Sequence, residues 1–351
     1  MATICVLNAG SSTLKYAVYE TEPALHRLSG ATIEGGGLDQ IPIPDNVAAF
    51  GHRVVHGGPD LSQPVVIDPQ TLARIEAVSP LAPLHNPPAL AVIAALGKRF
   101  PGVKQVACFD TSFHRGHPAV ADRFALPDAL YREGVRRYGF HGLSYEYIAG
   151  ALETVAPAVA KGRVVVAHLG SGASMCGLVG GRSVDSSMGF TALDGLPMGT
   201  RSGSLDVGVI LWLQQTKGWP VGQVEHFLYH DCGLKGLSGL SNDMRILLAS
   251  DAPLARLAVD YFVYHVARTA GALAASTFGL DAMVFTAGIG EHSPEIRARV
   301  LRRLAWLGFA VDDVANAAGG PLLTTAASKL PAYTIPTDEA LTIARHTASL
   351  I

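Results

Sequence analysis

Apolar positions near the N-terminus predict two short strands joined by a loop of small residues. The run Thr3-Ile-Cys-Val-Leu-Asn8 has the composition of a buried strand, and Leu14-Lys-Tyr-Ala-Val-Tyr19 predicts a second strand after Ala9-Gly-Ser-Ser12. The same order of strand, glycine loop and strand recurs over 164–179. We interpret the two copies as one duplicated element, one in each domain, with chance repetition of a short pattern as the alternative.

Helical patterns occupy much of the remaining chain. The predicted helices cover 86–99, 252–277, 293–307 and the stretch that follows 337–339. The first opens with Asn86 as a cap residue followed by proline and closes on basic residues, and Gly308 is the expected stop of the third. The Ala-rich stretch 252–277 predicts one long helix or a pair. Because strands alternate with helices, the pattern indicates an α/β protein, whereas 21–50 is weakly patterned and predicts a loose connection.

Composition narrows the class of protein. A length of 351 residues corresponds to about two domains, since domains average roughly 150 residues. Charged residues make up 16% and hydrophobic residues 49%, which excludes a disordered chain. The net charge of −2 lacks the basic surplus that nucleic acid or an anionic membrane would attract. The 38 glycines exceed the usual share of about 7% and require a separate explanation.

The cysteines and the N-terminus predict a location. Four cysteines with no paired spacing indicate neither a zinc site nor a disulfide framework. The first residues lack the pattern of a signal peptide, and no apolar run approaches the roughly 18 residues that span a bilayer. We therefore expect a cytoplasmic protein that binds neither membrane nor nucleic acid.

Several common catalytic sequences are absent. The chain has no P-loop, no nucleophile elbow and no H-E-x-x-H sequence. His226 and His230 lie four apart on a predicted helix, which is the spacing of a metal pair. A metal would need a third ligand from elsewhere, so a surface or packing role is favoured for both.

Three glycine loops have the composition of anion sites. Small residues let backbone N–H groups approach a phosphate, and serine hydroxyls add donors. The loop before Lys15, the loop 170–174 and the cluster 284–292 share this composition, and the last leads into a helix N-terminus. A tight turn is the alternative for each loop alone. Their recurrence favours phosphate contact.

Arginine and histidine lie beside glycine in three further segments, 51–58, 136–142 and 198–203. Arg53 and Arg201 are suited to bidentate binding of a phosphate or carboxylate. Structural ion pairs with Asp194, Asp206 or Asp243 explain either arginine equally well. Two carboxylates, Asp110 after a predicted strand and Glu339 in a first helical turn, suit Mg²⁺, although an acidic residue in a first turn is common in any helix.

Together these segments resemble the acetokinase family, that is, acetate kinase and its propionate and butyrate kinase relatives. The matching runs occur in family order along the chain: 8–15, 51–58, 82–87, 109–111, 137–142, 168–170, 188–191, 199–203, 286–291 and 335–337. The resemblance implies two duplicated actin-like (ribonuclease H-like) domains flanking a nucleotide cleft. It places an N-terminal domain at 1–112 plus 341–351, on the carboxylate side, and a C-terminal domain at 113–340, on the nucleotide side.

The resemblance also implies a reaction. The γ-phosphoryl of ATP would pass reversibly and directly, in line, to acetate, giving acetyl phosphate and ADP with Mg²⁺ or Mn²⁺ as cofactor. A carboxylate is already ionised and needs no general base, so catalysis reduces to positioning and charge stabilisation. The family further implies a homodimer.

Site roles carry over residue by residue. The catalytic set would be Arg53, Asp110, His141 and Arg201, in which Arg53 binds the carboxylate, Asp110 supports Arg53 or the metal, and the other two stabilise the phosphoryl group. The acyl group would contact Val55, Leu84, Phe140 and Ala192. The nucleotide would contact Ser12, Lys15, His168, Gly170, Ser171, Asp243, Met244, Arg245, Gly288 and His292. Asn8 and Glu339 would hold the metal.

Four positions depart from the family pattern. Ala192 replaces a proline of the acyl pocket, and since one methylene is worth only about 1–3 kcal/mol of discrimination, propionate or butyrate is the alternative substrate. Ser171 and His292 each replace an asparagine near the nucleotide, and Ser204 replaces an acid. The chain is also shorter than the family before Gly51, where the family has an amphipathic helix. A non-catalytic nucleotide-binding regulator of the same fold is the alternative from another class.

Overall fold

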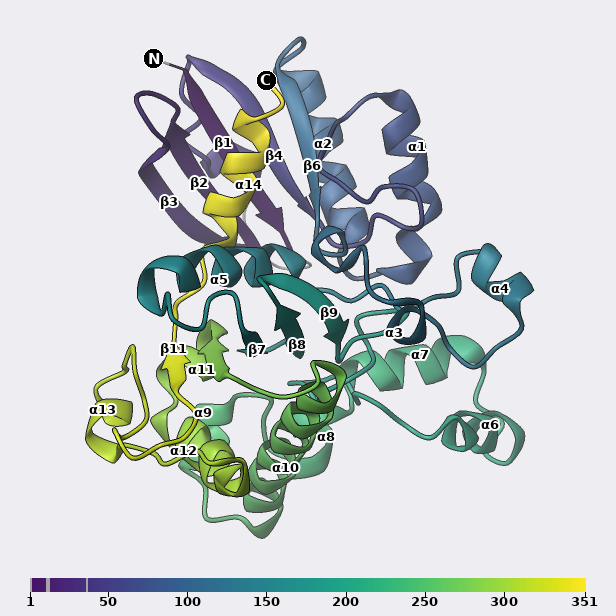
Figure 1. Ribbon diagram of the computed structural model, residues 1–351. Helices are drawn as coiled ribbons and strands as arrows, with labels where there is room; N and C mark the ends of the chain where they lie inside the picture. Colours follow the sequence, from purple (N-terminus) through teal and green to yellow (C-terminus); the bar gives the residue numbers. More distant parts are fainter. Residues whose placement is uncertain (1, 11–12, 36) are drawn as a thin grey trace. The chain divides into compact units, whose positions relative to one another are not determined.

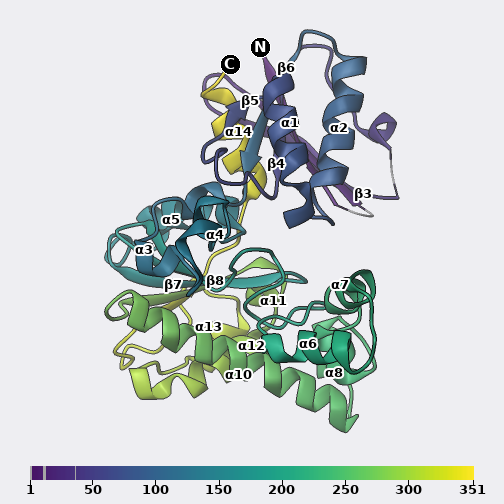
Figure 2. The same ribbon diagram turned by 90° about the vertical axis from the view of Figure 1, so that its right-hand side faces the viewer.

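The computed structural model describes residues 2–10, 13–35 and 37–351, and its chain divides into two compact units (Figures 1 and 2). Unit 1 comprises Met1–Arg115, Ala125–Tyr147 and Asp338–Ile351, and unit 2 comprises Gly116–Phe124 and Ile148–Thr337. Each unit is built around one sheet. Among the helices of the described residues, none has the length and apolar character needed to cross a membrane.

The sheet of unit 1 has its apolar strand β1 near the centre. Its strands are β1 (Thr3–Ala9), β2 (Thr13–Glu20), β3 (His26–Glu34), β4 (Val47–Val54), β5 (Val65–Val66) and β6 (Lys104–Phe109), in the order β3-β2-β1-β4-β6-β5. Strand β1 is antiparallel to β2, as the hairpin pattern predicted, and parallel to β4. Strand β4 is in turn parallel to β6, so both strands end at the same edge.

Strand β1 is buried on both faces of this sheet. Successive side chains of a strand point to opposite faces, so its residues enter two different clusters. Ile4 and Val6 pack with Ile343 of α14 on one face. Cys5 and Leu7 pack with Leu96 of α2 on the other. The helices and short helical turns that lie wholly in unit 1 are η1 (Leu38–Gln40), α1 (Pro69–Ala77), η2 (Ser79–Leu81), α2 (Asn86–Arg99), η3 (Ser112–His114), α4 (Asp128–Arg132) and α14 (Glu339–Ala348). Helix α5 (Gly142–Val155) begins in unit 1.

The sheet of unit 2 repeats the plan of the first. Its strands are β7 (Arg163–Leu169), β8 (Ala173–Val179), β9 (Arg182–Ser186), β10 (Ala282–Thr286) and β11 (Ala332–Thr334), in the order β11-β10-β7-β8-β9. Strand β7 is antiparallel to β8 and parallel to β10, as β1 is to β2 and β4. The predicted duplication of an α/β unit is therefore confirmed at the level of topology.

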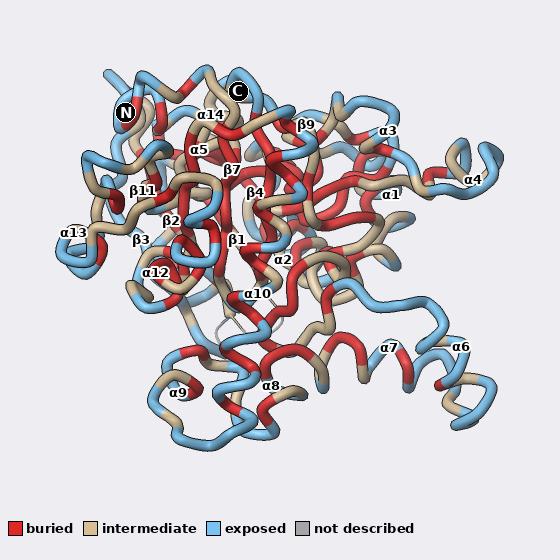
Figure 3. Tube along the Cα trace, turned by 60° about the horizontal axis from the view of Figure 1, so that its bottom comes forward, coloured by how far each residue is buried: buried red, intermediate tan, exposed pale blue. Residues whose placement is uncertain are grey.

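Helices of unit 2 differ widely in burial (Figure 3). They are α3 (Ala119–Asp122), α6 (Val207–Gln215), α7 (Val221–His230), α8 (Gly233–Ser238), α9 (Met244–Leu248), α10 (Pro253–Ser276), α11 (Ala287–His292), α12 (Pro294–Arg303), η4 (Ala305–Leu307) and α13 (Asp313–Ala317). Helix α10 is one continuous helix with a buried alanine and valine stripe that contacts β7 and β8. Most of α6 is exposed or half-buried.

Three sequence-based expectations need correction. The helix that begins after Ser293 ends at Arg303 and not at Leu307, because a separate 3₁₀ turn covers Ala305–Leu307. Gly308, with a φ of 109°, ends that turn. The weakly patterned stretch 21–50 contains β3, whose residues are almost all exposed and therefore lack alternation. Asn86 is not the cap of α2, since His85 occupies that position and the Asn86 side chain bonds elsewhere.

Candidate active site

Strands β4 and β6 bring Arg53 and Asp110 together in unit 1. Arg53 lies on β4, and Asp110 directly follows β6, its parallel neighbour. The guanidinium of Arg53 donates from Nε to Asp110 Oδ1 at 3.0 Å and from Nη2 to Oδ2 at 2.5 Å. This is the two-pronged geometry that fixes the plane of an arginine. Asp110 is 1% exposed and was predicted to support Arg53 or the metal. Both of its carboxylate oxygens accept from Arg53, which agrees with the first of these roles.

The charge of Arg53 is held by its neighbours. Burial lowers the pKa of the Arg53 guanidinium, but the nearby carboxylates of Asp110 and Glu339 outweigh burial and hold that pKa above its usual range. The side chain remains 16% exposed. Arg53 is therefore a permanent cation with a fixed orientation whose side chain stays partly accessible, as an anion receptor requires.

Two side chains whose oxygen atoms could bind a metal lie beside the same guanidinium. Asn8, on β1, accepts a hydrogen bond at its Oδ1 from Arg53 Nη1 at 3.3 Å. The Glu339 carboxylate, in the first turn of α14, lies 3.9 Å from Arg53 Nε and is 20% exposed. An amide oxygen and a carboxylate suit Mg²⁺, which takes few protein ligands and completes its shell with water and phosphates. The donor set thus fits the predicted metal.

His141 lies at the start of α5 in an unusual backbone conformation. Its φ is 57°, in the left-handed region that only glycine adopts without strain. The next residue, Gly142, donates its N–H to the Asp110 carbonyl at 2.8 Å. The His141 carbonyl accepts from Ser144 and Tyr145 in the first turn of the helix. The loop therefore ties His141 to the residue that orients Arg53.

The predicted acyl-contact residues of unit 1 are mostly buried. Val55 is 5% and Phe140 1% exposed, whereas Leu84 is half-buried. The imidazole Nε2 of buried His114 lies 2.9 Å from the Phe140 carbonyl oxygen, which anchors that segment. These side chains can supply an apolar environment for a short alkyl group.

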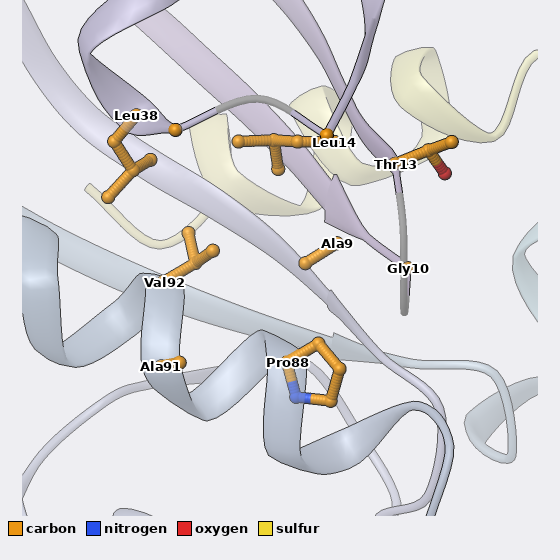
Figure 4. A pocket seen from close by; sticks show the side chains of 10 residues that line it. Ala9, Gly10, Thr13, Leu14, Leu38, Pro88, Ala91 and Val92 are labelled. Carbon is orange, nitrogen blue, oxygen red and sulfur yellow. The ribbon is translucent and has the colours of Figure 1, made fainter.

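Unit 1 has an apolar pocket beside the ends of β1 and β2 (Figure 4). It measures about 440 Å³ and is lined by Ala9, Gly10, Thr13, Leu14, Gly35, Gly37, Leu38, Pro88, Ala91 and Val92. Ser12, predicted to contact the nucleotide, lies outside the described residues. Lys15 is exposed on β2, where it pairs in register with Asn8.

Unit 2 contains a larger pocket, of about 750 Å³. Seven residues predicted to contact the nucleotide line it: Gly170, Ser171, Asp243, Met244, Arg245, Gly288 and His292. Asp243 caps α9 and forms an ion pair with Arg245 at 2.6 Å, and the hydrogen bonds from Arg245 lower the pKa of its carboxyl. The sequence did not single out Asn242, Leu248 and Ile289, which line the same pocket beside predicted residues. His168 is buried near the end of β7.

One carboxylate organises the short helix α11, which lies between β10 and α12. Glu291 Oε1 accepts from the Ala287 N–H at 2.8 Å, from Thr337 N–H at 3.2 Å and from the Thr286 hydroxyl at 3.3 Å. Ala287 has a φ of 63°, a strained conformation that these bonds stabilise. Helix α11 is followed by Ser293, which caps α12 and lines the 750 Å³ pocket. Backbone N–H groups and a helix N-terminus are available there for an anion.

Arg201 is anchored to the segment that carries Ala192. Its Nη1 donates to the Ala192 carbonyl at 2.6 Å, and Ala192 is 7% exposed. Two of the carboxylates considered as structural partners have other roles, since Asp206 caps α6 and Asp243 caps α9. Ser204, where the family has an acid, donates its hydroxyl hydrogen bond to Asp194 at 2.6 Å.

His226 and His230 lie on α7 with ring centroids 4.7 Å apart, and His226 lies 3.6 Å from Asp231. Residues 2–10, 13–35 and 37–351 contain no group of three or more histidines, cysteines or acidic residues that could hold a metal ion. The surface role favoured for the pair agrees with the 67% exposure of His226.

Comparison with known proteins places this geometry in a family. The Acetokinase family model matches residues 38–345. The chain is 52% identical to the acetate kinase of Nitrobacter hamburgensis over 390 aligned positions, covering 100% of this chain and 96% of that protein. It is 49% identical to the acetate kinase of Rhizobium meliloti, covering 100% and 99%.

Solved structures agree with the sequence comparisons. A propionate kinase from Francisella tularensis subsp. tularensis SCHU S4 superposes with a TM-score of 0.91 at 34% identity, and the Porphyromonas gingivalis acetate kinase with 0.88 at 31%. Both matches cover 100% of each chain. Since the family model spans most of the chain and these relatives match over nearly their whole length, the chain belongs to the acetokinase family.

Proposed function

We propose that this protein transfers the γ-phosphoryl group of ATP reversibly to acetate, giving acetyl phosphate and ADP. The observation that carries the proposal is the Arg53–Asp110 pair beside Asn8 and Glu339, because a fixed cation next to buried apolar side chains suits a short carboxylate. A nucleotide-binding regulator of the same fold has no use for such an acceptor site. Full-length similarity to acetate kinases supports the same conclusion.

The proposed roles in the reaction fall on residues of both units. In unit 1, Arg53 binds the acetate carboxylate, Val55, Leu84 and Phe140 contact its methyl group, and His141 stabilises charge on the phosphoryl group. Among the residues of unit 2, Arg201 is assigned to stabilising charge on the phosphoryl group and Ala192 to contact with the acyl group. The acetate oxygen attacks phosphorus directly, and ADP leaves in line. The attacking group is already ionised, so no proton is removed.

Asn8 and Glu339 would hold Mg²⁺, or Mn²⁺, through oxygen atoms. The ion would neutralise charge on the ATP phosphates during transfer. The residues that line the 750 Å³ pocket of unit 2 bind the nucleotide. Its phosphates would contact Gly170, Ser171 and Gly288, and also His168, which does not line the pocket. The adenosine side would contact Asp243, Met244, Arg245 and His292. Lys15, on β2, and Ser12, outside the described residues, are further proposed nucleotide contacts.

Trapping of the product as a hydroxamate tests the function. Incubation with ATP, Mg²⁺, acetate and hydroxylamine should form acetohydroxamate, and omission of acetate should abolish it. Absence of product with every acid of two to four carbons would overturn the kinase proposal in favour of the regulator.

Propionate is the second candidate substrate, because Ala192 leaves more room than the proline of the family pattern. Ala192 is anchored by Arg201 through its carbonyl, so the space lies beside a proposed phosphoryl-contacting residue. We expect acetate to retain the higher kcat/KM. A kcat/KM for propionate or butyrate above that for acetate would reassign the substrate.

We further propose a cytoplasmic homodimer. The support for self-association is helix α6, most of which is exposed (Figure 3). Its apolar residues Val207, Leu211 and Trp212 are 75%, 52% and 48% exposed. Asp206 and Lys217 lie at opposite ends of this helix, so two antiparallel copies would match opposite charges around an apolar centre. Sedimentation should give a dimer that Trp212→Lys converts to monomers. A variant that remains dimeric would exclude α6 as the interface.

A further inference from the structure

The side chain of Asn86 bonds to the backbone of a residue thirty positions away. Its Oδ1 accepts from the His56 N–H at 3.1 Å, and its Nδ2 donates to the His56 carbonyl at 3.1 Å. Asn86 and His56 are both fully buried. The amide therefore satisfies both backbone groups of one residue with its own two polar atoms, which leaves no freedom in its orientation.

These bonds replace the sheet at the point where β4 ends. The pairing of β4 with β6 runs to Val54, opposite Phe109, and His56 lies two residues beyond it. A buried backbone N–H and C=O without a strand neighbour must be paired in another way. Asn86 performs that pairing from the first turn of α2, so it joins the end of β4 to the loop that precedes α2.

All three proposed acyl-contact residues of unit 1 belong to segments joined at this point. Val55 adjoins His56, and Leu84 lies two residues before Asn86. The His56 ring packs edge-on against Phe140, with ring centroids 5.4 Å apart, and against Tyr138, at 4.4 Å. A shift of Asn86 relative to His56 would therefore change the distance between the walls of the acyl site.

We propose that Asn86 is a positioning residue for acyl-chain selection. It holds the segments of Val55, Leu84 and Phe140 at the spacing that accepts a methyl group and disfavours an ethyl group. The inference rests on the proposed acyl site. Since a single methylene is worth roughly 10-fold or more in kcat/KM, a small relaxation of these walls is measurable as specificity.

The test compares Asn86→Ala, which removes both bonds, with Asn86→Asp, which keeps an acceptor for the His56 N–H and loses the donor to its carbonyl. The ratio of kcat/KM for acetate to that for propionate should fall by at least about 3-fold in both variants, a part of the value of one methylene. The KM for ATP should not change, because the residues that line the proposed nucleotide pocket lie in unit 2. If Asn86→Ala does not fold, Asn86→Asp alone decides.

A matched control is Gln105→Leu. Gln105 Nε2 donates to the Ile93 carbonyl at 3.1 Å, so this side-chain amide also contacts α2. Ile93 lies in the middle of α2, away from the loop that carries Leu84. Gln105→Leu should lower the melting temperature and leave the acetate-to-propionate ratio unchanged. A ratio equally unchanged in both Asn86 variants would reduce Asn86 to a structural residue and overturn the proposal.

Leu84→Ala separates this inference from the function on which it rests. If the acyl site is assigned correctly, Leu84→Ala shifts the ratio towards propionate. A shift with Leu84→Ala but not with the Asn86 variants overturns the positioning role alone. No shift with Leu84→Ala overturns the acyl site and the inference with it.

Discussion

Arg201 is a cation that donates a short hydrogen bond to the Ala192 carbonyl. We expect Arg201→Ala to lower kcat by at least about 100-fold, because charge that develops on the phosphoryl group loses a fixed donor. Steady-state kinetics with acetate and ATP measure the change. Arg302→Ala is the control, since Arg302 is an exposed partner of Asp313 and should keep normal kcat. Near-normal kcat in Arg201→Ala would remove this residue from the mechanism.

Asp110 acts at the same scale by orienting Arg53. Replacement by Asn removes a buried charge that pairs with the guanidinium at two positions. The loss of one partner of a buried ion pair lowers the free energy of unfolding by about 3 kcal/mol. We expect Asp110→Asn to raise the KM for acetate and to leave ATP affinity unchanged. Titration calorimetry with ATP and kinetics in acetate separate the two. Weakened ATP binding with normal acetate KM would contradict the assigned role.

Individual residue types were readable from the sequence, whereas their partners were not. Arg53 and Asp110 each stood out beside an apolar run, yet ion pairing of Arg53 with a different aspartate was an equal alternative. The choice depends on β4 and β6 being parallel neighbours, a long-range contact without a local signal. The prediction that Asn86 caps α2 was wrong for a related reason. Its cap-like position was visible, but its bond to His56 requires the end of β4 to lie alongside.

At the scale of elements, α5 begins against the backbone of the active site. A Cβ on Gly142 would lie 2.2 Å from the Asp110 carbonyl oxygen and 3.0 Å from the Phe113 Cβ. Gly142→Ala should therefore displace His141 or Asp110 and lower both stability and kcat. Thermal unfolding and kinetics measure the two effects.

The same helix offers the opposite substitution. A Cβ on exposed Gly150 meets no atom within 4 Å, so Gly150→Ala should stabilise the protein by about 0.5–1 kcal/mol through helix propensity alone. Equal effects of the two substitutions would show that the contact at Gly142 is unimportant.

Elements with a buried face were predictable, and those without one were not. The β1–β2 and β7–β8 hairpins followed from apolar runs, and α2 from its prolines and basic end. Strand β3 has no buried residue and therefore no alternation. The predicted domain boundaries, near 112 and 341, remain predictions. The compact unit 1 includes 125–147, a segment that no sequence pattern assigned to the first domain.

At the scale of the whole molecule, one buried histidine makes stability depend on pH. Burial lowers the pKa of His52 to about 4, against a hydrogen bond with Gln105 that raises it. The unfolded chain binds this proton near pH 6.5 and the folded chain does not. The stability that neutral His52 permits is present above pH 6.5 and is lost as the pH falls towards 4, at about 1.4 kcal/mol per pH unit.

His52→Gln isolates this contribution. Its difference in unfolding free energy from the natural chain should narrow by about 1.4 kcal/mol between pH 6 and pH 5, since glutamine does not titrate. Denaturant titrations at both pH values measure it. A difference that stays constant would mean that His52 is protonated in the folded protein.

Helix α14 covers one face of the unit 1 sheet, with Ile343 and Ala344 in its core, and approaches β4 so closely that a Cβ on Gly51 would meet Ile343 and Thr347. Unit 2 needs no residue beyond 337, but unit 1 needs 338–351. A ribosome that has released every residue of unit 2 has therefore not yet completed unit 1. The half that carries the proposed acetate receptor is finished last, and a translation product interrupted before 338 lacks both a wall of its core and Glu339.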